Sequence, residues 1–97
     1  MKKWWIIGQR AFQGCTALKS VVLSESLVEL DSNVFDGCTN LTTIELSAGI
    51  SKIGYGAFTG CDNLTTVNFK GTEAEWLALV AKVNSEALNN AKVNYLA

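Results

Sequence analysis

The three cysteines are the residues of this chain best suited to chemistry, because a thiolate can attack a carbonyl or bind a metal ion. Cys15, Cys38 and Cys61 recur at intervals of 23 residues. Zinc sites usually have four N or S ligands, often in close pairs such as C-x₂-C, and this chain has no close pair and no histidine. We therefore expect no metal site and no cofactor, and we interpret the cysteines as small buried side chains with free thiols.

The composition also gives no support to an enzyme. A serine or cysteine nucleophile needs an adjacent base, commonly histidine, and the chain contains none. No pair among the nine acidic residues stands out from ordinary surface charge. Gly54-Tyr55-Gly56 lacks the third glycine of a nucleotide-binding loop. The sequence predicts no catalytic residues.

Length and charge narrow the class of partner. A chain of 97 residues suits one domain, here residues 1–97. The net charge of -1 produces no field that attracts nucleic acid. No apolar run approaches the roughly 18 residues of a membrane-spanning helix, and the apolar stretch Trp4–Ile7 is too short for a signal peptide. We expect no nucleic acid partner, no membrane span and no signal peptide.

The 23-residue interval of the cysteines extends to their neighbours, which indicates a repeat protein. The columns that recur with this offset are Phe12, Phe35 and Phe58; Gly14, Gly37 and Gly60; Leu18, Leu41 and Leu64; Val21, Ile44 and Val67; Leu23, Leu46 and Phe69; and Leu27 and Ile50. Stacked repeats would place the residues of a column about 4.7–4.9 Å apart, so each apolar column becomes a ladder through one core.

Each repeat contains two strand-like pieces joined by turns. In the second repeat, apolar and polar residues alternate at the end of segment 41–46, and segment 50–53 contains a second apolar pair, Ile50 and Ile53. Asp31–Cys38 has turn-forming residues around an apolar pair, which suits one helical or 3₁₀ turn closed by a glycine with positive φ. Each repeat would therefore form one turn of a solenoid.

The alternation along the first piece predicts which side chains face outward. These residues form the candidate binding face: Ser20, Val22, Thr43, Glu45, Thr66 and Asn68. Small polar columns on a rigid sheet suit contacts with a protein or a glycan, and a solvated surface without a partner is the alternative. Glu29 and Lys52 share a column, so we also expect an ion pair between repeats, worth at most about 1 kcal/mol if exposed.

The repeat pattern changes at Thr72. Thr72 and Glu75 form a predicted capping box, and Trp76, Leu79, Val80 and Val83 follow the spacing of an apolar helix face. Asn89-Asn90 then precedes a predicted final strand over residues 92–96. We expect residues 73–97 to form a helix and strand that cap the third repeat.

At the other end, Trp4 lies in the column of Leu27 and Ile50, so residues 1–6 read as a partial repeat. This register predicts an apolar edge that is open to another chain or to further repeats. The candidate self-association edge consists of Trp4, Trp5, Ile7 and Phe12.

The pattern Ile53-Gly54-Tyr55-Gly56-Ala57-Phe58-Thr59-Gly60-Cys61-Asp62-Asn63-Leu64-Thr65-Thr66-Val67 resembles the BspA-like leucine-rich repeats, and the resemblance covers residues 4–72. It implies an α/β repeat solenoid, a short right-handed coil with repeats at 7–29, 30–52 and 53–72 and a C-terminal helix-strand cap. The chain departs from the family pattern in two ways. Ser24 and Ser47 stand where the family often has proline after the strand, and the middle repeat has Leu30-Asp31 and Val34 in place of Ile-Gly and Ala.

The resemblance also implies bacterial or protozoan proteins, at the cell surface or secreted, that bind host proteins or other cells. We therefore expect a non-catalytic, adhesion-type protein-binding module. The alternative is a structural fragment of a longer repeat array, a homo-oligomer whose main contact is self-association through its N-terminal edge.

Overall fold

A computed structural model describes residues 6–23, 25–83 and 85–96 of the chain. Its elements, in order, are β1 (Ile6–Ile7), β2 (Ser20–Val22), β3 (Glu29–Leu30), β4 (Thr43–Ser47), β5 (Lys52–Ile53), β6 (Thr66–Lys70), α1 (Glu73–Val80), α2 (Glu86–Asn90) and β7 (Lys92–Tyr95). Trp4 and Trp5 lie outside the described residues.

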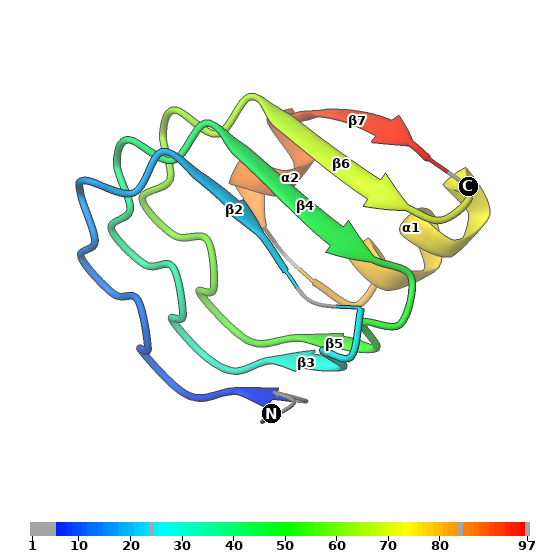
Figure 1. The fold of residues 1–97 in the computed structure, drawn as a ribbon, viewed down its shortest axis with the longest axis horizontal. Coiled ribbons are helices and arrows are strands. Elements are labelled where there is room, and N and C mark those ends of the chain that lie inside the picture. Colours follow the sequence, from blue (N-terminus) through cyan, green and yellow to red (C-terminus); the bar gives the residue numbers. More distant parts are fainter. Residues whose placement is uncertain (1–5, 24, 84, 97) are drawn as a thin grey trace.

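The strands form two parallel sheets, one in the order β1-β3-β5 and one in the order β2-β4-β6-β7. Strands β1 to β4 each pair with the strand 23 residues further along, as in Val21 with Ile44 and Ile44 with Val67. Figure 1 shows the two sheets on different sides of the molecule, connected by turns at both ends of each strand. The 23-residue columns of the sequence therefore correspond to neighbouring positions in space.

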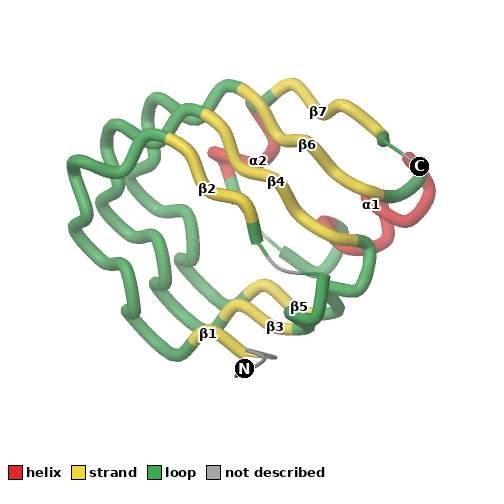
Figure 2. Tube along the Cα trace, in the orientation of Figure 1, coloured by secondary structure: helices red, strands yellow, loops and turns green. Residues whose placement is uncertain are grey.

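The segment between the two sheets, such as residues 8–18 of the first repeat, alternates two kinds of backbone hydrogen bond. The N–H of Phe12 donates to the carbonyl of Val34 in the next repeat at 2.9 Å, whereas the N–H of Gln13 donates to Arg10 three residues earlier at 3.1 Å. Gly14, Gly37 and Gly60 close these segments with φ of 74°, 79° and 79°, as the sequence predicts. Figure 2 shows these segments as loops without a regular helix.

The core consists of the predicted apolar columns. Phe12 stacks on Phe35 and Phe35 on Phe58, each with ring centroids 5.5 Å apart and with interplanar angles of 8° and 16°. Phe35 and Phe58 are buried, while Phe12 at the first position of the stack is 40% exposed. The leucine, isoleucine and valine columns lie beside them and are buried, except that Leu18 and Val21 of the first repeat are partly buried.

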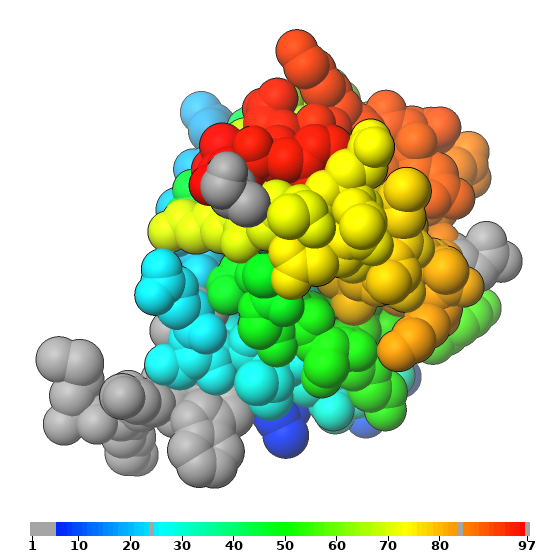
Figure 3. All heavy atoms as spheres, turned by 90° about the vertical axis from the view of Figure 1, so that its right-hand side faces the viewer, coloured from blue at the N-terminus to red at the C-terminus, as the bar shows by residue number. Residues whose placement is uncertain are grey.

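The C-terminal segment begins with the predicted capping box. Thr72 Oγ1 accepts from the N–H of Glu75 at 3.2 Å, and Glu75 Oε1 accepts from the N–H of Thr72 at 2.9 Å. On α1, Trp76 and Leu79 are buried, and the Trp76 ring lies 5.2 Å from that of Phe69. Figure 3 shows α1 (yellow) packed beside the 47–50 turn (green) at this end of the molecule.

Two details of the C-terminal segment differ from prediction. Helix α1 ends at Val80, so Val83 contacts the core from the following loop and not from the helix. Residues 86–90 form the short helix α2, with Ser85 as its N-cap, where Asn89-Asn90 suggested only a break. The predicted final strand is present as β7, which ends at Tyr95, one residue earlier than predicted.

Candidate functional site

The outward face of the larger sheet holds all six residues of the candidate binding face. Parallel pairing aligns Ser20 with Thr43 and Thr43 with Thr66, which makes one row. A second row consists of Val22, Glu45 and Asn68. We refer to these two rows, together with their continuation on β7, as the strand face.

Exposure follows the predicted alternation. Ser20 and Val22 on β2 are exposed, and Thr43, Glu45, Thr66 and Asn68 on the inner strands are half-buried because strands flank them on both sides. The intervening residues on β4 and β6, such as Ile44 and Phe69, point into the core and are buried. Strands β4 and β6 thus present polar side chains on a backbone that is fixed by hydrogen bonds on both sides.

Strand β7 extends both rows by one residue. Lys92 pairs with Thr66 and Asn94 with Asn68, and Asn94 Nδ2 donates to Asn68 Oδ1 at 2.9 Å. The sequence analysis did not include these two residues in the face, although Lys92-Val93-Asn94-Tyr95 has the same alternation as Thr66-Val67-Asn68-Phe69. The similarity escapes a search at 23 residues because the offset here is 26.

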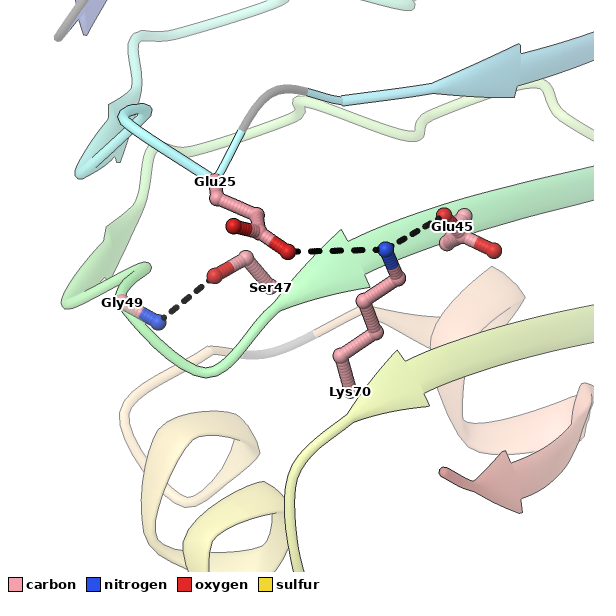
Figure 4. Close-up of polar contacts among 5 residues, drawn as sticks. All are labelled: Glu25, Glu45, Ser47, Gly49 and Lys70. Atoms are coloured by element: carbon pink, nitrogen blue, oxygen red, sulfur yellow. Dashed lines mark hydrogen bonds and ion pairs between the residues drawn. The ribbon is translucent and has the colours of Figure 1, made fainter. Parts of the chain in front are cut away.

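Charged groups gather at one end of the strand face (Figure 4). Lys70 Nζ lies 3.4 Å from Glu45 Oε2 and 3.7 Å from Glu25 Oε1, so one cation joins two acidic side chains from different repeats. Beside them, Ser47 Oγ accepts from the N–H of Gly49 at 3.1 Å and fixes the turn after β4. Lys70 thus pairs with both carboxylates, and the three side chains form an ion-pair cluster with a net charge of -1.

The expected ion pair between Glu29 and Lys52 is not formed. The two residues are aligned across β3 and β5, but the ion pairs of the described residues do not include them. Lys52 is exposed, so its ammonium group keeps its hydration instead of pairing.

The cysteine column joins neighbouring repeats through hydrogen bonds of its thiols. Cys38 Sγ donates to the carbonyl of Phe12 at 3.2 Å, and Cys61 Sγ donates to that of Phe35 at 3.1 Å. Burial raises the pKa of Cys61 from 9.0 to about 12 and also raises the pKa of Cys38. Both thiols therefore stay protonated at neutral pH and are poor nucleophiles. All three cysteines are free, and the described residues contain no group of three side chains suited to a metal ion.

The N-terminal edge is apolar where the structure describes it. Phe12 is 40% and Ile6 50% exposed, and Ile7 is half-buried. These residues line a hollow of about 350 Å³ together with Gly8, Ala11, Val22, Leu23 and Leu27. The structure thus brings Ile7 and Phe12 of the candidate self-association edge together.

None of the helices that the structure describes is long and apolar enough to cross a membrane.

Short parallel strands in register, with apolar columns at a 23-residue interval, define a repeat protein of the leucine-rich type. The family model described as "BspA type Leucine rich repeat region (6 copies)" matches residues 2–96, so the chain belongs to this family.

A solved structure similar to this chain is a leucine rich cell surface protein from Faecalibacterium prausnitzii A2-165, with a TM-score of 0.75 and 28% sequence identity. The similarity covers 77% of this chain and 20% of that protein, so this chain spans about a fifth of the neighbour's length. The comparison with curated proteins gives no match.

Proposed function

We propose that this chain is a non-catalytic, adhesion-type module that binds a protein through its strand face. The observation that carries the proposal is the two rows of the strand face, which lie in register across four parallel strands and are polar at every position except Val22. A sheet of this kind loses little conformational freedom on binding, and that favours recognition by a preformed surface.

The chemistry of the face favours a protein partner over other classes. The rows combine hydroxyl and amide groups with one charged cluster, so they offer both donors and acceptors to a polar surface. The net charge of -1 argues against nucleic acid. The absence of histidine and the raised pKa values of the buried thiols argue against covalent catalysis.

The membership in a leucine-rich repeat family supports the finer architecture. We propose a short right-handed solenoid in which α1, α2 and β7 act as the C-terminal cap. Buried Trp76, Leu79 and Leu88 support this role, because they cover apolar groups of the third repeat that water would otherwise reach. A location at the surface of a bacterial cell, and a host or cell-surface protein as the partner, rest on the family and on the name of the structural neighbour.

A binding screen with a charge-matched control tests the proposal. The intact chain is measured by biosensor against a panel of purified extracellular-matrix and cell-surface proteins. The face variant carries Thr43→Lys, Glu45→Lys and Asn68→Lys. The control carries Thr16→Lys, Ala17→Lys, Thr39→Lys and Ala78→Lys, which change four exposed residues outside the strand face and alter the net charge by the same four units.

The proposal predicts that the face variant loses at least about tenfold in affinity for any protein selected, whereas the control stays near wild type. Equal binding by the face variant and the wild type, with circular dichroism showing both folded, would exclude the strand face.

A second candidate function is self-association through the N-terminal edge. The hollow lined by Ile7, Phe12 and their apolar neighbours favours it, because exposed apolar patches of this kind mark protein contacts. Sedimentation equilibrium of the wild type and of Phe12→Lys tests this candidate: it predicts dimers that the substitution disperses, and a wild-type monomer at all concentrations would eliminate it.

A further inference from the structure

The third repeat carries a row of backbone N–H groups that have no acceptor among the described residues. In the second repeat, the N–H groups of Asn33, Phe35 and Gly37 donate to the carbonyls of Tyr55, Ala57 and Thr59 at 3.0, 2.8 and 2.8 Å. The equivalent groups 23 residues later are those of Gly56, Phe58 and Gly60, and none of them donates to a residue that the structure describes. We call these three groups the donor row.

The middle member of the donor row is also buried. Phe58 is only 1% exposed, so its N–H has little access to bulk water. Buried backbone N–H groups are almost always paired, because an unpaired one forfeits its hydration without compensation. This N–H therefore marks a position where the described residues supply no acceptor.

A groove lies against the donor row. Its volume is about 770 Å³, which falls in the range of ligand sites in proteins. One wall is the third-repeat segment 53–64, and the other consists of Lys82, Val83 and residues of α2 such as Ala87. The C-terminal segment thus leaves space beside residues 56–60 instead of supplying their acceptors.

The spacing of the donor row identifies the chemistry of the occupant. Donors on every second residue match acceptors on every second residue, and the second repeat satisfies its own row with three different carbonyls of residues 55–59, a run of turns in the third repeat. A compact anion would need donors that converge on one point. We propose that this groove binds a segment of another polypeptide that follows the same succession of turns as residues 55–59 and accepts from the donor row through alternate backbone carbonyl groups.

Side chains at the groove would add specificity. Tyr55 is 89% exposed and lines the groove, so its ring is available to cover an apolar side chain of the bound segment. Lys82 and Glu86 place charges of both signs along the opposite wall.

A second copy of the chain is a weaker fit. Its edge at Gln9, Ala11 and Gln13 also offers carbonyls without partners among the described residues. Stacking a whole repeat onto the third one would require the position on β6 that β7 already occupies. A single short segment of polypeptide does not meet this obstacle. The site is separate from the strand face, so its failure would leave the proposed function untouched.

Selection of peptides against the intact chain tests this inference. A phage library of random 12-residue peptides is panned on the wild-type protein, and the strongest peptide is synthesised and titrated into ¹⁵N-labelled protein. We expect the largest amide shifts at Gly56, Phe58 and Gly60. Failure to select any peptide, or shifts confined to the strand face or the N-terminal edge, would overturn the inference.

An ester scan of the selected peptide then tests the backbone contacts. Replacing one amide by an ester weakens the carbonyl as an acceptor, and each important position should lose about two- to tenfold in affinity. The donor row predicts that these losses occur at alternate positions. A scan without this period would contradict recognition through the donor row.

Two variants of the protein locate the peptide independently. Thr59→Trp fills the groove, while Gln13→Trp changes the equivalent exposed residue of the first repeat. We expect Thr59→Trp to reduce affinity at least about tenfold and Gln13→Trp to leave it unchanged. Lys82→Trp, on the opposite wall, replaces Thr59→Trp if that variant melts at a lower temperature. Unchanged affinity in the folded variant would overturn the inference, as would a dimer of the chain alone that Thr59→Trp dissociates.

Discussion

The thiol of Cys61 donates a hydrogen bond to the carbonyl of Phe35, 3.1 Å away and 26 residues earlier in the chain. The contact joins the third repeat to the second inside the core, and Cys38 repeats it with Phe12. The cysteine column therefore supplies the same hydrogen bond between successive repeats. Because a thiolate has no proton to donate, ionisation of the thiol removes this bond and opposes folding.

The first prediction concerns alkaline pH. The Cys61 thiol ionises near 9.0 when unfolded, whereas burial raises its pKa in the folded chain to about 12. Between these values the unfolded state releases a proton that the folded state keeps, so the free energy of unfolding falls as pH rises. The stabilisation is fully present below about pH 9 and is lost towards about pH 12.

Cys61→Ser provides the comparison, because its hydroxyl does not titrate in this range. Urea unfolding at intervals from pH 8 to 12 should show a steeper loss of stability in the wild type than in the variant. Parallel curves would mean that Cys61 is not buried as the structure shows.

The second prediction concerns the phenylalanine stack. Phe35 contacts aromatic rings on both faces and is fully buried, so Phe35→Ala should lower the free energy of unfolding by about 3–5 kcal/mol. Phe12→Ala should cost clearly less, because that ring has one aromatic neighbour and is 40% exposed. Urea denaturation measures the loss of stability in both variants, and an equal loss would contradict the placement of Phe35 inside the stack and Phe12 at its exposed end.

The third prediction compares two glycines of one column. A Cβ on Gly54 would lie 2.6 Å from the Asp31 carbonyl carbon and 2.6 Å from the Ser32 nitrogen, so Gly54→Ala must push two repeats apart. A Cβ on Gly8 would meet nothing within 4 Å.

Thermal unfolding of the two variants measures this difference. Gly54→Ala should cost roughly 1–3 kcal/mol, while Gly8→Ala should stay within about 0.5 kcal/mol of the wild type. A tolerated Gly54→Ala would show that the repeats are less tightly packed there.

The fourth prediction concerns the ion pair at the end of the strand face. Lys70 and Glu45 lie 3.4 Å apart with side chains 43% and 23% exposed, so water and salt screen their attraction. A double-mutant cycle with Lys70→Met and Glu45→Gln should give a coupling energy of about 1 kcal/mol or less. The coupling should shrink in 1 M NaCl, and a large coupling that ignores salt would contradict the observed exposure.

The repeat region was predictable because the types of its core side chains recur every 23 residues in the sequence. Phe35, Cys38 and Ile44 occupy the core positions that a 23-residue period requires, and the capping box at Thr72 has a local signature. The outward placement of Thr43 and Glu45 follows from simple alternation. Their role in binding stays a prediction.

The remaining features depend on relationships that leave no regular trace in the sequence. Two helices shift the register of β7 to an offset of 26, so Asn94 could not be aligned with Asn68 by the 23-residue period. Lys70 stands where the earlier repeats have Ser24 and Ser47, and its partners became apparent only in space. The donor row consists of backbone groups, which every residue type except proline carries.

The most direct test of the strand face is a nuclear magnetic resonance titration of the ¹⁵N-labelled chain with the protein selected in the binding screen. The account predicts that amide shifts concentrate in residues 43–47, 66–70 and 92–95. Shifts confined to residues 8–15, 31–38 or 53–61, with those strands unchanged, would contradict it.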